Sequence, residues 1–570
     1  MKKRLFFWFF IASAVLGDDL PHIGYIYPAG GMPGTTFKVS VGGQYLKDTL
    51  SIHLSGGRAS AKVIDYKYEP DPRARNRIKN MMQKMEARLA EEPDEKVREQ
   101  LRYQMQHAEG EMAMVKMAAR EKRSDPEMYA KKQFNPQISD TVMLEITLDS
   151  KVEPGVHELR LITPSGLSNH LMFHVTELPE LCELEPNNTI FETKGSAPEL
   201  PLLLNGQIMP GDVDSFRFSA KRGRDLVFRV QARSLVPYLA DAVPGWFQAV
   251  LTLYDAKGNE IAYIDDFRFD PDPVLICQVP EDGEYILEIR DSIYRGRRDF
   301  VYRIEMGELP FIDHVFPLGG EENKGVPIQL YGVNLPQKEM IIDTHGNAPE
   351  IRDVSVQQGL RRSNTRLFAV DTIPSVAELE PNNLPSEAQL LIGDVVVDGR
   401  IARPGDVDCF QFKGHKMDVV EIEVFARRLD SPLDARLILL DSEENILAIS
   451  DDEVDRGSGL VTHHADSLLR YELPTTGLYT VRLDELLGKG GEEYAYRLRV
   501  GEEQPDYSLR IVPSSLTIPE NGNATVTVYA LRKAGFDGEI KLSIAHGPNG
   551  IELSRATIPK GQNKVHITLS

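Results

Sequence analysis

An internal repeat constrains the fold of this chain more than any other feature of its sequence. Glu183–Asn188 reads Glu-Leu-Glu-Pro-Asn-Asn and recurs as Glu378–Asn383, 195 residues later. Pro210–Asp214 reads Pro-Gly-Asp-Val-Asp and recurs as Pro404–Asp408, 194 residues later. Four further pairs follow in the same order: Ala232–Leu235 with Ala426–Leu429, Leu251–Asp255 with Leu437–Asp441, Gly283–Tyr285 with Gly477–Tyr479, and Tyr302–Arg303 with Tyr496–Arg497. Matches that keep their order over such a length indicate a duplicated domain.

A weaker repeat precedes each copy. Tyr27–Gly31 (Tyr-Pro-Ala-Gly-Gly) is similar to Phe316–Gly320 (Phe-Pro-Leu-Gly-Gly). We call the weaker repeat A and the stronger repeat B, so that the chain is ordered A1–B1–A2–B2 and ends in a C-terminal segment. The predicted boundaries are 18–178 for A1, 179–308 for B1, 309–373 for A2, 374–503 for B2 and 504–570 for the C-terminal segment.

The strands expected within these segments are short and alternate apolar with polar residues. The clearest runs are Val39–Val41, Glu158–Ile162, Phe216–Phe218, Leu226–Val230, Tyr285–Ile289 and Val481–Leu483. Clusters of Pro, Gly, Asp and Asn separate them, which is typical of sandwiches of antiparallel sheets. The predicted fold class is therefore mainly β, a series of tandem β-sandwich domains.

One region of A1, residues 71–130, departs from this pattern because its apolar residues recur at helical spacing. They are Ile78, Met82, Met85 and Leu89, followed by Val97, Leu101, Met105, Ala108, Met112 and Val115. Pro93 lies between the two sets, and proline is tolerated only at the start of a helix. These features predict an inserted α-helical hairpin. Its methionine-rich stripe either packs between the helices or against the adjacent sheet, or forms an adaptable surface for a partner.

The first seventeen residues have the pattern of a secretory signal peptide. Lys2, Lys3 and Arg4 precede the apolar run Leu5–Leu16, which is too short to span a bilayer comfortably. A retained N-terminal anchor is the alternative. We therefore expect an exported protein that is secreted, held at the cell surface or located in the periplasm, with no transmembrane segment after signal cleavage.

Charge and motif content exclude several functions. Acidic residues number 86 against 65 basic ones, which argues against nucleic acid as a partner. Three cysteines cannot form a disulfide scaffold, and we expect Cys182, Cys277 and Cys409 to be small buried residues. Neither H-E-x-x-H nor G-x-S-x-G occurs, and His463–Asp466 (His-His-Ala-Asp) is too little for a zinc site. The sequence thus predicts no catalytic residues and no enzyme.

The B segments resemble the bacterial pre-peptidase C-terminal (PPC) domain. The shared elements are the E-x-E-P-N-N lead-in, the P-G-D-x-D-x-F strand, the L-x-L-x-D hairpin with its following D-D, and the closing G-x-Y strand. The A segments resemble IPT/TIG immunoglobulin-like domains through Thr163–Asn169 and Phe173–Val175, although the helical hairpin departs from an ordinary domain of that kind. The resemblance implies β-sandwich folds and a relationship to modules that accompany secreted peptidases and to collagen-binding domains of clostridial collagenases.

The best candidate site is acidic. In extended segments, Glu183 and Glu185 share one side, as do Asp212 and Asp214, and carboxylate and amide oxygens are what Ca²⁺ requires. In the collagen-binding relatives a calcium ion joins the corresponding residues. The resemblance therefore implies a calcium ligand set of Glu183, Glu185, Asn187, Asn188, Asp212 and Asp214 in B1, and of Glu378, Glu380, Asn382, Asn383, Asp406 and Asp408 in B2. The other interpretation is that the Asn and Asp side chains only cap turns.

A second acidic cluster falls in predicted hairpin loops, where solvated carboxylates are expected rather than a metal site. It comprises Asp265, Asp266, Asp270 and Asp272 in B1, with Asp451, Asp452, Glu453 and Asp455 as the counterparts in B2.

The sequence as a whole favours an exported, non-enzymatic binding or spacer protein, stiffened by calcium, whose partner is an extracellular polymer or a surface protein. One alternative is a set of accessory domains of a secreted peptidase or other hydrolase whose catalytic domain is absent from this chain. Another is a structural component of a surface layer. The span from Tyr507 to Ser570 is shorter than the roughly 100 residues of an immunoglobulin-like sandwich, so we also expect the natural protein to continue.

Overall fold

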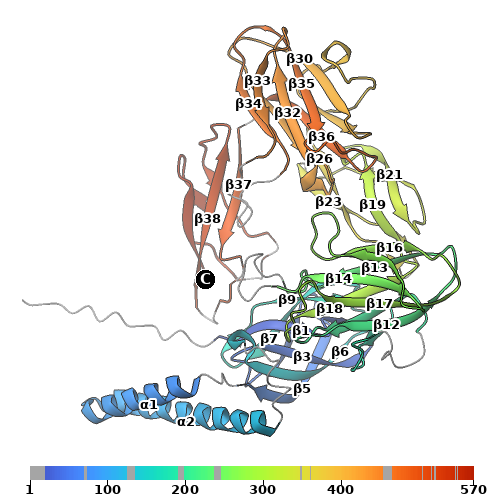
Figure 1. Ribbon diagram of the computed structural model, residues 1–570. Coiled ribbons are helices and arrows are strands. Elements are labelled where there is room, and N and C mark those ends of the chain that lie inside the picture. The colour runs from blue at the N-terminus through green and yellow to red at the C-terminus, as the bar shows by residue number, and fades with distance from the viewer. Residues whose placement is uncertain are drawn as a thin grey trace, which may run out of the picture.

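The computed structural model describes most of the chain, and the first nineteen residues, with the predicted signal peptide, lie outside the described part. The described residues are 20–69, 74–124, 135–189, 198–236, 246–346, 349–359, 361–453, 465–503, 505–514, 516–518, 522–545, 547 and 550–570. Within them the protein is mainly β, as the sequence predicts, and its sheets succeed one another along a curved path (Figure 1).

A1 is a sandwich of two sheets with strand orders β1-β3-β6-β5 and β2-β9-β7-β4. Along β6, every second side chain points into the space between the two sheets, and these side chains (Val142, Leu144, Ile146 and Leu148) are all buried there. The elements are β1 (His22–Tyr27), β2 (Gly30–Gly31), β3 (Thr36–Gln44), β4 (Ser51–Leu54), β5 (Ala59–Tyr68), η1 (Pro136–Ile138), β6 (Asp140–Leu148), β7 (Gly155–Thr163), β8 (Gly166–Leu167) and β9 (Leu171–Val175).

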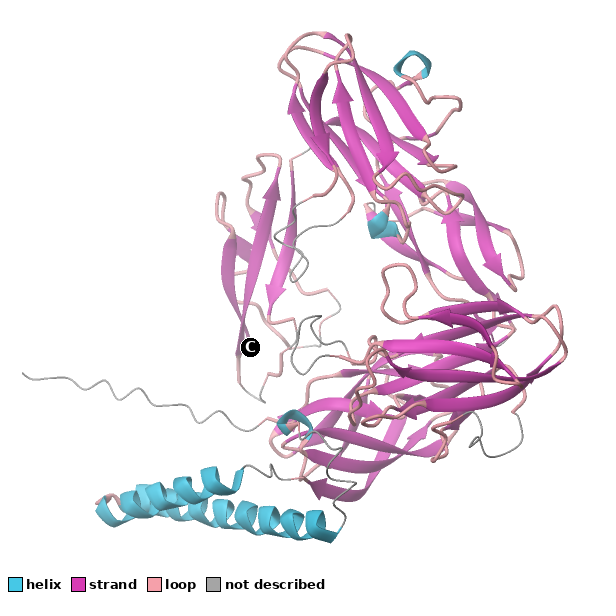
Figure 2. Ribbon diagram, in the orientation of Figure 1, coloured by secondary structure: helices cyan, strands magenta, loops and turns pink. Residues whose placement is uncertain are grey.

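The predicted helical hairpin is present between β5 and β6 as α1 (Ala74–Glu91) and α2 (Glu95–Ser124). Figure 2 shows the two helices side by side, extending away from the sheets of A1. Ile78, Ala108 and Val115 are buried between them, and Met82, Met85 and Met112 pack against this small cluster. The methionine-rich stripe is therefore the hairpin's own core.

B1 is a second sandwich, with sheets ordered β10-β11-β18-β13-β16 and β12-β17-β14-β15. Its elements are β10 (Glu180–Cys182), β11 (Leu202–Gln207), β12 (Asp214–Ala220), β13 (Asp225–Gln231), β14 (Ala249–Asp255), β15 (Glu260–Ile264), β16 (Val274–Gln278), β17 (Gly283–Asp291) and β18 (Val301–Gly307).

B2 repeats this topology, which agrees with the duplication seen in the sequence. Its sheets are ordered β27-β29-β36-β31-β34 and β28-β30-β35-β32-β33, so that only the short β28 is additional. The elements are β27 (Ser375–Ala377), η2 (Pro385–Glu387), β28 (Gln389–Leu390), β29 (Val395–Arg400), β30 (Val407–Gly414), β31 (Val419–Phe425), η3 (Arg427–Leu429), β32 (Ala435–Leu440), β33 (Ile446–Ser450), β34 (Leu468–Glu472), β35 (Gly477–Glu485) and β36 (Ala495–Glu502).

A2 lies between the two B sandwiches and is smaller than A1. Its sheets are ordered β19-β21-β22 and β20-β26-β23, and β24 pairs with β25 in a hairpin. The elements are β19 (Phe311–Phe316), β20 (Gly319–Glu321), β21 (Gly325–Val333), β22 (Glu339–Asp343), β23 (Glu350–Val354), β24 (Gln357–Gln358), β25 (Arg361–Arg362) and β26 (Arg366–Asp371).

The C-terminal segment forms two small sheets, β37-β38-β41 and β39-β40. The elements are β37 (Asp506–Val512), β38 (Ala524–Lys533), β39 (Ile540–Lys541), β40 (Thr557–Ile558) and β41 (Lys564–Leu569).

Candidate metal site

The acidic motif of B1 folds into a compact cluster where the segment after β10 passes the start of β12. Carboxylate oxygens of Glu185, Asp212 and Asp214 lie within 4.8 Å of one another. The backbone fixes this arrangement, because Ser215 N–H donates to the Asn187 carbonyl (3.0 Å) and so ties the lead-in to the strand. Glu183 and Glu185 therefore lie beside the aspartates, as the sequence predicts.

The cluster contains more acceptors than donors. Tyr302 O–H lies 2.5 Å from Asp214 Oδ2 and 3.3 Å from Glu183 Oε2, and it has one proton for both carboxylates. Glu183 Oε1 accepts from Gln207 N–H and Tyr27 O–H, both at 3.0 Å. Tyr27 belongs to A1, so the cluster lies at the joint between A1 and B1.

The second repeat builds a related cluster from Glu378, Glu380 and Asp408, whose oxygens also lie within 4.8 Å of one another, with Glu378, the counterpart of Glu183, as the third member instead of Asp406. Tyr496 O–H reaches Asp408 Oδ2 (2.7 Å) and Glu378 Oε1 (2.9 Å). Cys409 N–H donates to the Asn382 carbonyl (2.9 Å), as Ser215 does in B1. The two copies thus share the tyrosine between the carboxylates and the backbone hydrogen bond to the asparagine, while the trio of close carboxylates differs by one member.

Crowding of buried carboxyl groups raises their pKa values. Burial and the adjacent Glu183 raise the pKa of Asp214 to about 10, and burial raises that of Glu183 to about 7. In B2, burial and Glu378 raise the pKa of Asp408 to about 10. Among the described ion pairs, neither aspartate has a basic partner. No basic side chain in the described part of the chain forms an ion pair that would favour their ionised form.

Several oxygens in the clusters also lack a hydrogen-bond donor. Asp214 Oδ1 and Asn187 Oδ1 are buried without a partner, and so are Asp408 Oδ1 and Asn382 Oδ1 in B2. Unsatisfied buried polar atoms are costly and call for an explanation such as an ion. A donor set made only of carboxylate and amide oxygens matches Ca²⁺, whereas structural zinc sites are built from cysteine and histidine.

The remaining predicted ligands have different surroundings. Asp212 Oδ2 accepts from Met209 N–H (3.1 Å), and Asp406 Oδ2 accepts from Ala402 N–H (2.9 Å), so both aspartates also brace their own loops. Asn188 is exposed. Asn383 donates through its amide to Asp406 Oδ1 (3.0 Å) and to the Val407 carbonyl (3.2 Å). The turn-capping interpretation therefore holds for part of the motif.

Sequence reasoning found the acidic residues but missed the tyrosines and arginines around them. Tyr302 and Tyr496 bridge the carboxylates, and each is followed by a buried arginine that holds another acid. Arg303 pairs with Glu180 (2.8 Å) and Arg497 with Asp398 (2.7 Å). The recurrence of Tyr-Arg in both repeats was the available signal.

The structure corrects two expectations about other polar residues. Asp272 is not solvated: it is buried and accepts from the backbone N–H groups of residues 232, 233 and 234. In B2, Asp466 does the same for residues 426–428, whereas Asp455 lies outside the described residues. Of the three cysteines, only Cys409 is buried, while Cys182 is exposed and Cys277 half-buried.

Comparison with known proteins gives partial matches. No protein-family profile matches the chain. A probable subtilase-type serine protease from Deinococcus radiodurans is 31% identical over 140 residues, which is 24% of this chain and 18% of that protein. The chain thus spans less than a fifth of the length of this relative.

Two solved structures are similar at low identity. The pre-peptidase C-terminal domain of a Bacillus anthracis collagenase is 18% identical, with a TM-score of 0.16 and coverage of 21% of this chain and 99% of that domain. The glucan-binding protein SGBP-B of Bacteroides ovatus is 9% identical, with a TM-score of 0.13 and coverage of 83% and 71%. Among the described residues, no helix has the length and apolarity needed to span a membrane.

Proposed function

We propose that the chain is an exported, non-catalytic binding or spacer protein whose B domains bind calcium where they meet the A domains. Its partner is an extracellular polymer or a surface protein. The observation that carries the calcium proposal is the recurrence of the same unpartnered buried oxygens, on Asp214 and Asn187 in B1 and on Asp408 and Asn382 in B2.

The chemistry supports a divalent, oxygen-preferring cation. Glu183, Glu185, Asn187, Asp212 and Asp214 together offer enough oxygens for the six to eight that Ca²⁺ takes. A bound cation would supply the missing positive charge and favour the ionised form of Asp214. Because Tyr27 of A1 donates to Glu183, an ion at this cluster would also stiffen the A1–B1 joint.

The proposal is tested by calorimetric unfolding of the whole chain in EDTA and in millimolar Ca²⁺. A ligand that binds only the native state increases the free energy of unfolding, by about 2.7 kcal/mol when its free concentration is a hundred times Kd. The unfolding temperature rises accordingly. We expect Ca²⁺ to raise the unfolding temperatures of B1 and B2. Mg²⁺ should raise them less, because it demands a stricter coordination geometry and retains its water ligands. An unchanged calorimetric profile in Ca²⁺ would overturn the proposal.

The matched variants are Asp214→Asn and Asp408→Asn. Each keeps the size of the side chain and removes a carboxyl group whose ionisation is opposed by burial, so folding in EDTA should be preserved. The rise in unfolding temperature caused by Ca²⁺ should disappear from the domain that carries the change and remain in the other domain. Asp265→Asn, in the loop after β15 of B1, is the control and should retain both increments.

A second candidate function is that of accessory domains of a secreted peptidase. The match to a subtilase-type protease over 140 residues favours it. The complete reading frame and its neighbouring genes distinguish the two, since a protease signature joined to this chain would support the accessory role.

A further inference from the structure

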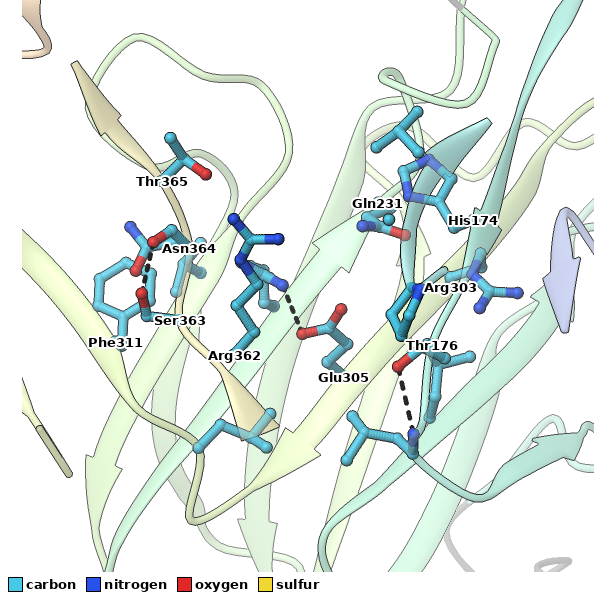
Figure 3. Close-up of a pocket in the computed structure, with 18 of the residues that line it drawn as sticks. His174, Thr176, Gln231, Arg303, Glu305, Phe311, Arg362, Ser363, Asn364 and Thr365 are labelled. Atoms are coloured by element: carbon cyan, nitrogen blue, oxygen red, sulfur yellow. Dashed lines mark hydrogen bonds and ion pairs between the residues drawn. The ribbon is translucent and has the colours of Figure 1, made fainter. Parts of the chain in front are cut away.

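A second site lies between A1, B1 and A2. There a cleft of about 610 Å³ is lined by residues from all three domains, a size in the usual range for small-molecule sites. Figure 3 shows His174, Gln231 and Arg303 on one side and Arg362, Ser363, Asn364 and Thr365 on the other. The candidate metal sites contribute no residue to this cleft, whereas Asp270 and Asp272 of the second acidic cluster do line it.

Arginine is concentrated in the cleft although the chain as a whole is acidic. The lining contains Arg229, Arg303, Arg361, Arg362 and Arg366. Two of them are neutralised within B1: Arg229 pairs with Glu305 (2.6 Å) and Arg303 with Glu180 (2.8 Å).

The guanidinium groups from A2 are less well paired. Arg361 donates to the Glu308 carbonyl (3.0 Å), and Arg362 donates to Ser355 Oγ (3.1 and 3.2 Å). Neither has an acidic partner among the ion pairs of the described residues. Arg366 lies 3.9 Å from Asp430, at the limit of an ion pair. Guanidinium groups held by neutral oxygens remain available for an anion.

The lining also contains five carboxylates, three of which have partners within B1. Asp270 accepts from Asp272 N–H. Glu305 is paired with Arg229, and both oxygens of Asp272 accept backbone N–H groups. Asp353 is exposed, and Glu177 is half-buried. Burial, and after it the charges of Arg303 and Arg229, lower the pKa of His174 to about 4, so this imidazole is neutral at neutral pH.

Polar atoms without partners line the same space. His174 Nε2, Gln231 Oε1, Arg303 Nε and Arg366 Nη2 are buried without a hydrogen bond. This set contains both donors and an acceptor, which suits a ligand bearing hydroxyl groups as well as a negative charge.

Stacking of a neutral sugar is disfavoured. The phenylalanines of the lining, Phe267 and Phe311, already have guanidinium groups over their rings: Arg268 and Arg366 lie 5.3 and 5.5 Å from the centre of Phe267, and Arg366 lies 5.7 Å from that of Phe311. Recognition must therefore rely on charge and hydrogen bonds.

We propose that the cleft binds a uronic acid, either as a free sugar acid or as a unit of an acidic polysaccharide. Its carboxylate would lie between Arg362 and Arg366, and its hydroxyl groups would meet Gln231, His174 and the polar residues that precede β26. This inference rests on the proposed binding function, for which it supplies a ligand, but it shares no residue with the calcium sites.

The test is calorimetric titration of the whole chain in EDTA, which prevents oligouronates from acting through calcium. We expect glucuronate to bind and glucose not to bind, and the affinity for glucuronate to fall with added salt. A trigalacturonate that binds more tightly than the monomer would identify the polymer as the ligand, whereas equal affinity would identify the free sugar acid. Acetate or sulfate competing as well as glucuronate would overturn the proposal, as would glucose binding equally.

Two variants locate the site. Arg362→Gln removes an exposed guanidinium and should weaken glucuronate binding about tenfold or more, as loss of a charge-assisted hydrogen bond does. Thr365→Trp should block the cleft without removing a charge. Arg510→Gln, in the C-terminal segment, is the control and should bind normally. Full binding by both cleft variants would overturn the assignment. Because the titrations contain no calcium, their outcome is separate from that of the calcium experiment.

Discussion

His174 shows how burial at a domain joint produces a pH dependence. Burial and the charges of Arg303, Arg229 and His157 lower its pKa from 6.5 to about 4. The folded protein therefore keeps this imidazole neutral in a pH range where the unfolded chain protonates it. The contribution of His174 to the free energy of unfolding is fully present above pH 6.5. It is lost as the pH drops toward 4, by up to about 3 kcal/mol.

The corresponding variant is His174→Gln, which cannot take up a proton. We expect urea unfolding of the N-terminal part of the protein to lose stability less steeply between pH 6.5 and pH 4 in this variant than in the parent. His53→Gln changes an exposed histidine of the same domain and should leave the slope as it is. Identical slopes for His174→Gln and the parent would show that another group causes the loss of stability between pH 6.5 and pH 4.

Residues of the candidate metal site differ in how far the sequence could predict them. Local spacing placed Asp212 beside Asp214, but Glu185 lies in a different repeated motif, and only the resemblance to PPC domains joined the two segments. Tyr302 comes from a strand 88 residues beyond Asp214, and nothing in the spacing indicates that its hydroxyl lies between two carboxylates. Such partners depend on the order of strands in a sheet, which local pattern does not determine.

At the scale of elements, the helical hairpin is a unit with its own core. Ile78 and Val115 are 1% and 3% exposed, and their cluster is separate from the core of the A1 sandwich. Helical periodicity predicted both helices because every contact that forms this core lies within a single short segment. The sequence left open what the methionine stripe packs against, since periodicity identifies an apolar face but not its neighbour.

This separation gives a prediction for Ile78→Asp. An unpaired charge in the hairpin core should unfold the two helices, because burying it costs several kcal/mol and the hairpin core is small. Circular dichroism at 222 nm should lose helical signal, while the calorimetric transition of the A1 sandwich stays in place. Met81→Asp, on the exposed side of α1, is the control. Loss of the A1 transition in Ile78→Asp would mean that the hairpin supports the sandwich.

At the scale of the whole molecule, the loop between β15 and β16 joins three domains. Arg268, in B1, donates to the Asp430 carbonyl of B2 (2.8 Å) and to Asp313 Oδ2 of A2 (2.9 Å). The ring of the neighbouring Phe269 lies 3.3 Å below the guanidinium of Arg427 in B2. On the B1 side this contact is made by Arg268 and Phe269, which lie outside the repeated motifs, so the duplication in the sequence could not reveal it.

The contacts of this loop should therefore stabilise the curved arrangement in which B2 lies close to B1. In the double variant Arg268→Ala, Phe269→Ala, B2 loses these contacts with B1, and small-angle scattering should give a larger radius of gyration with unchanged unfolding temperatures for the separate sandwiches. Arg224→Ala removes an exposed ion pair within B1 and should scatter like the parent. Because the adjacent Phe267 lines the arginine-rich cleft, the double variant should also bind glucuronate more weakly. An unchanged scattering curve would mean that the bend is fixed by the short connections between consecutive domains rather than by this loop.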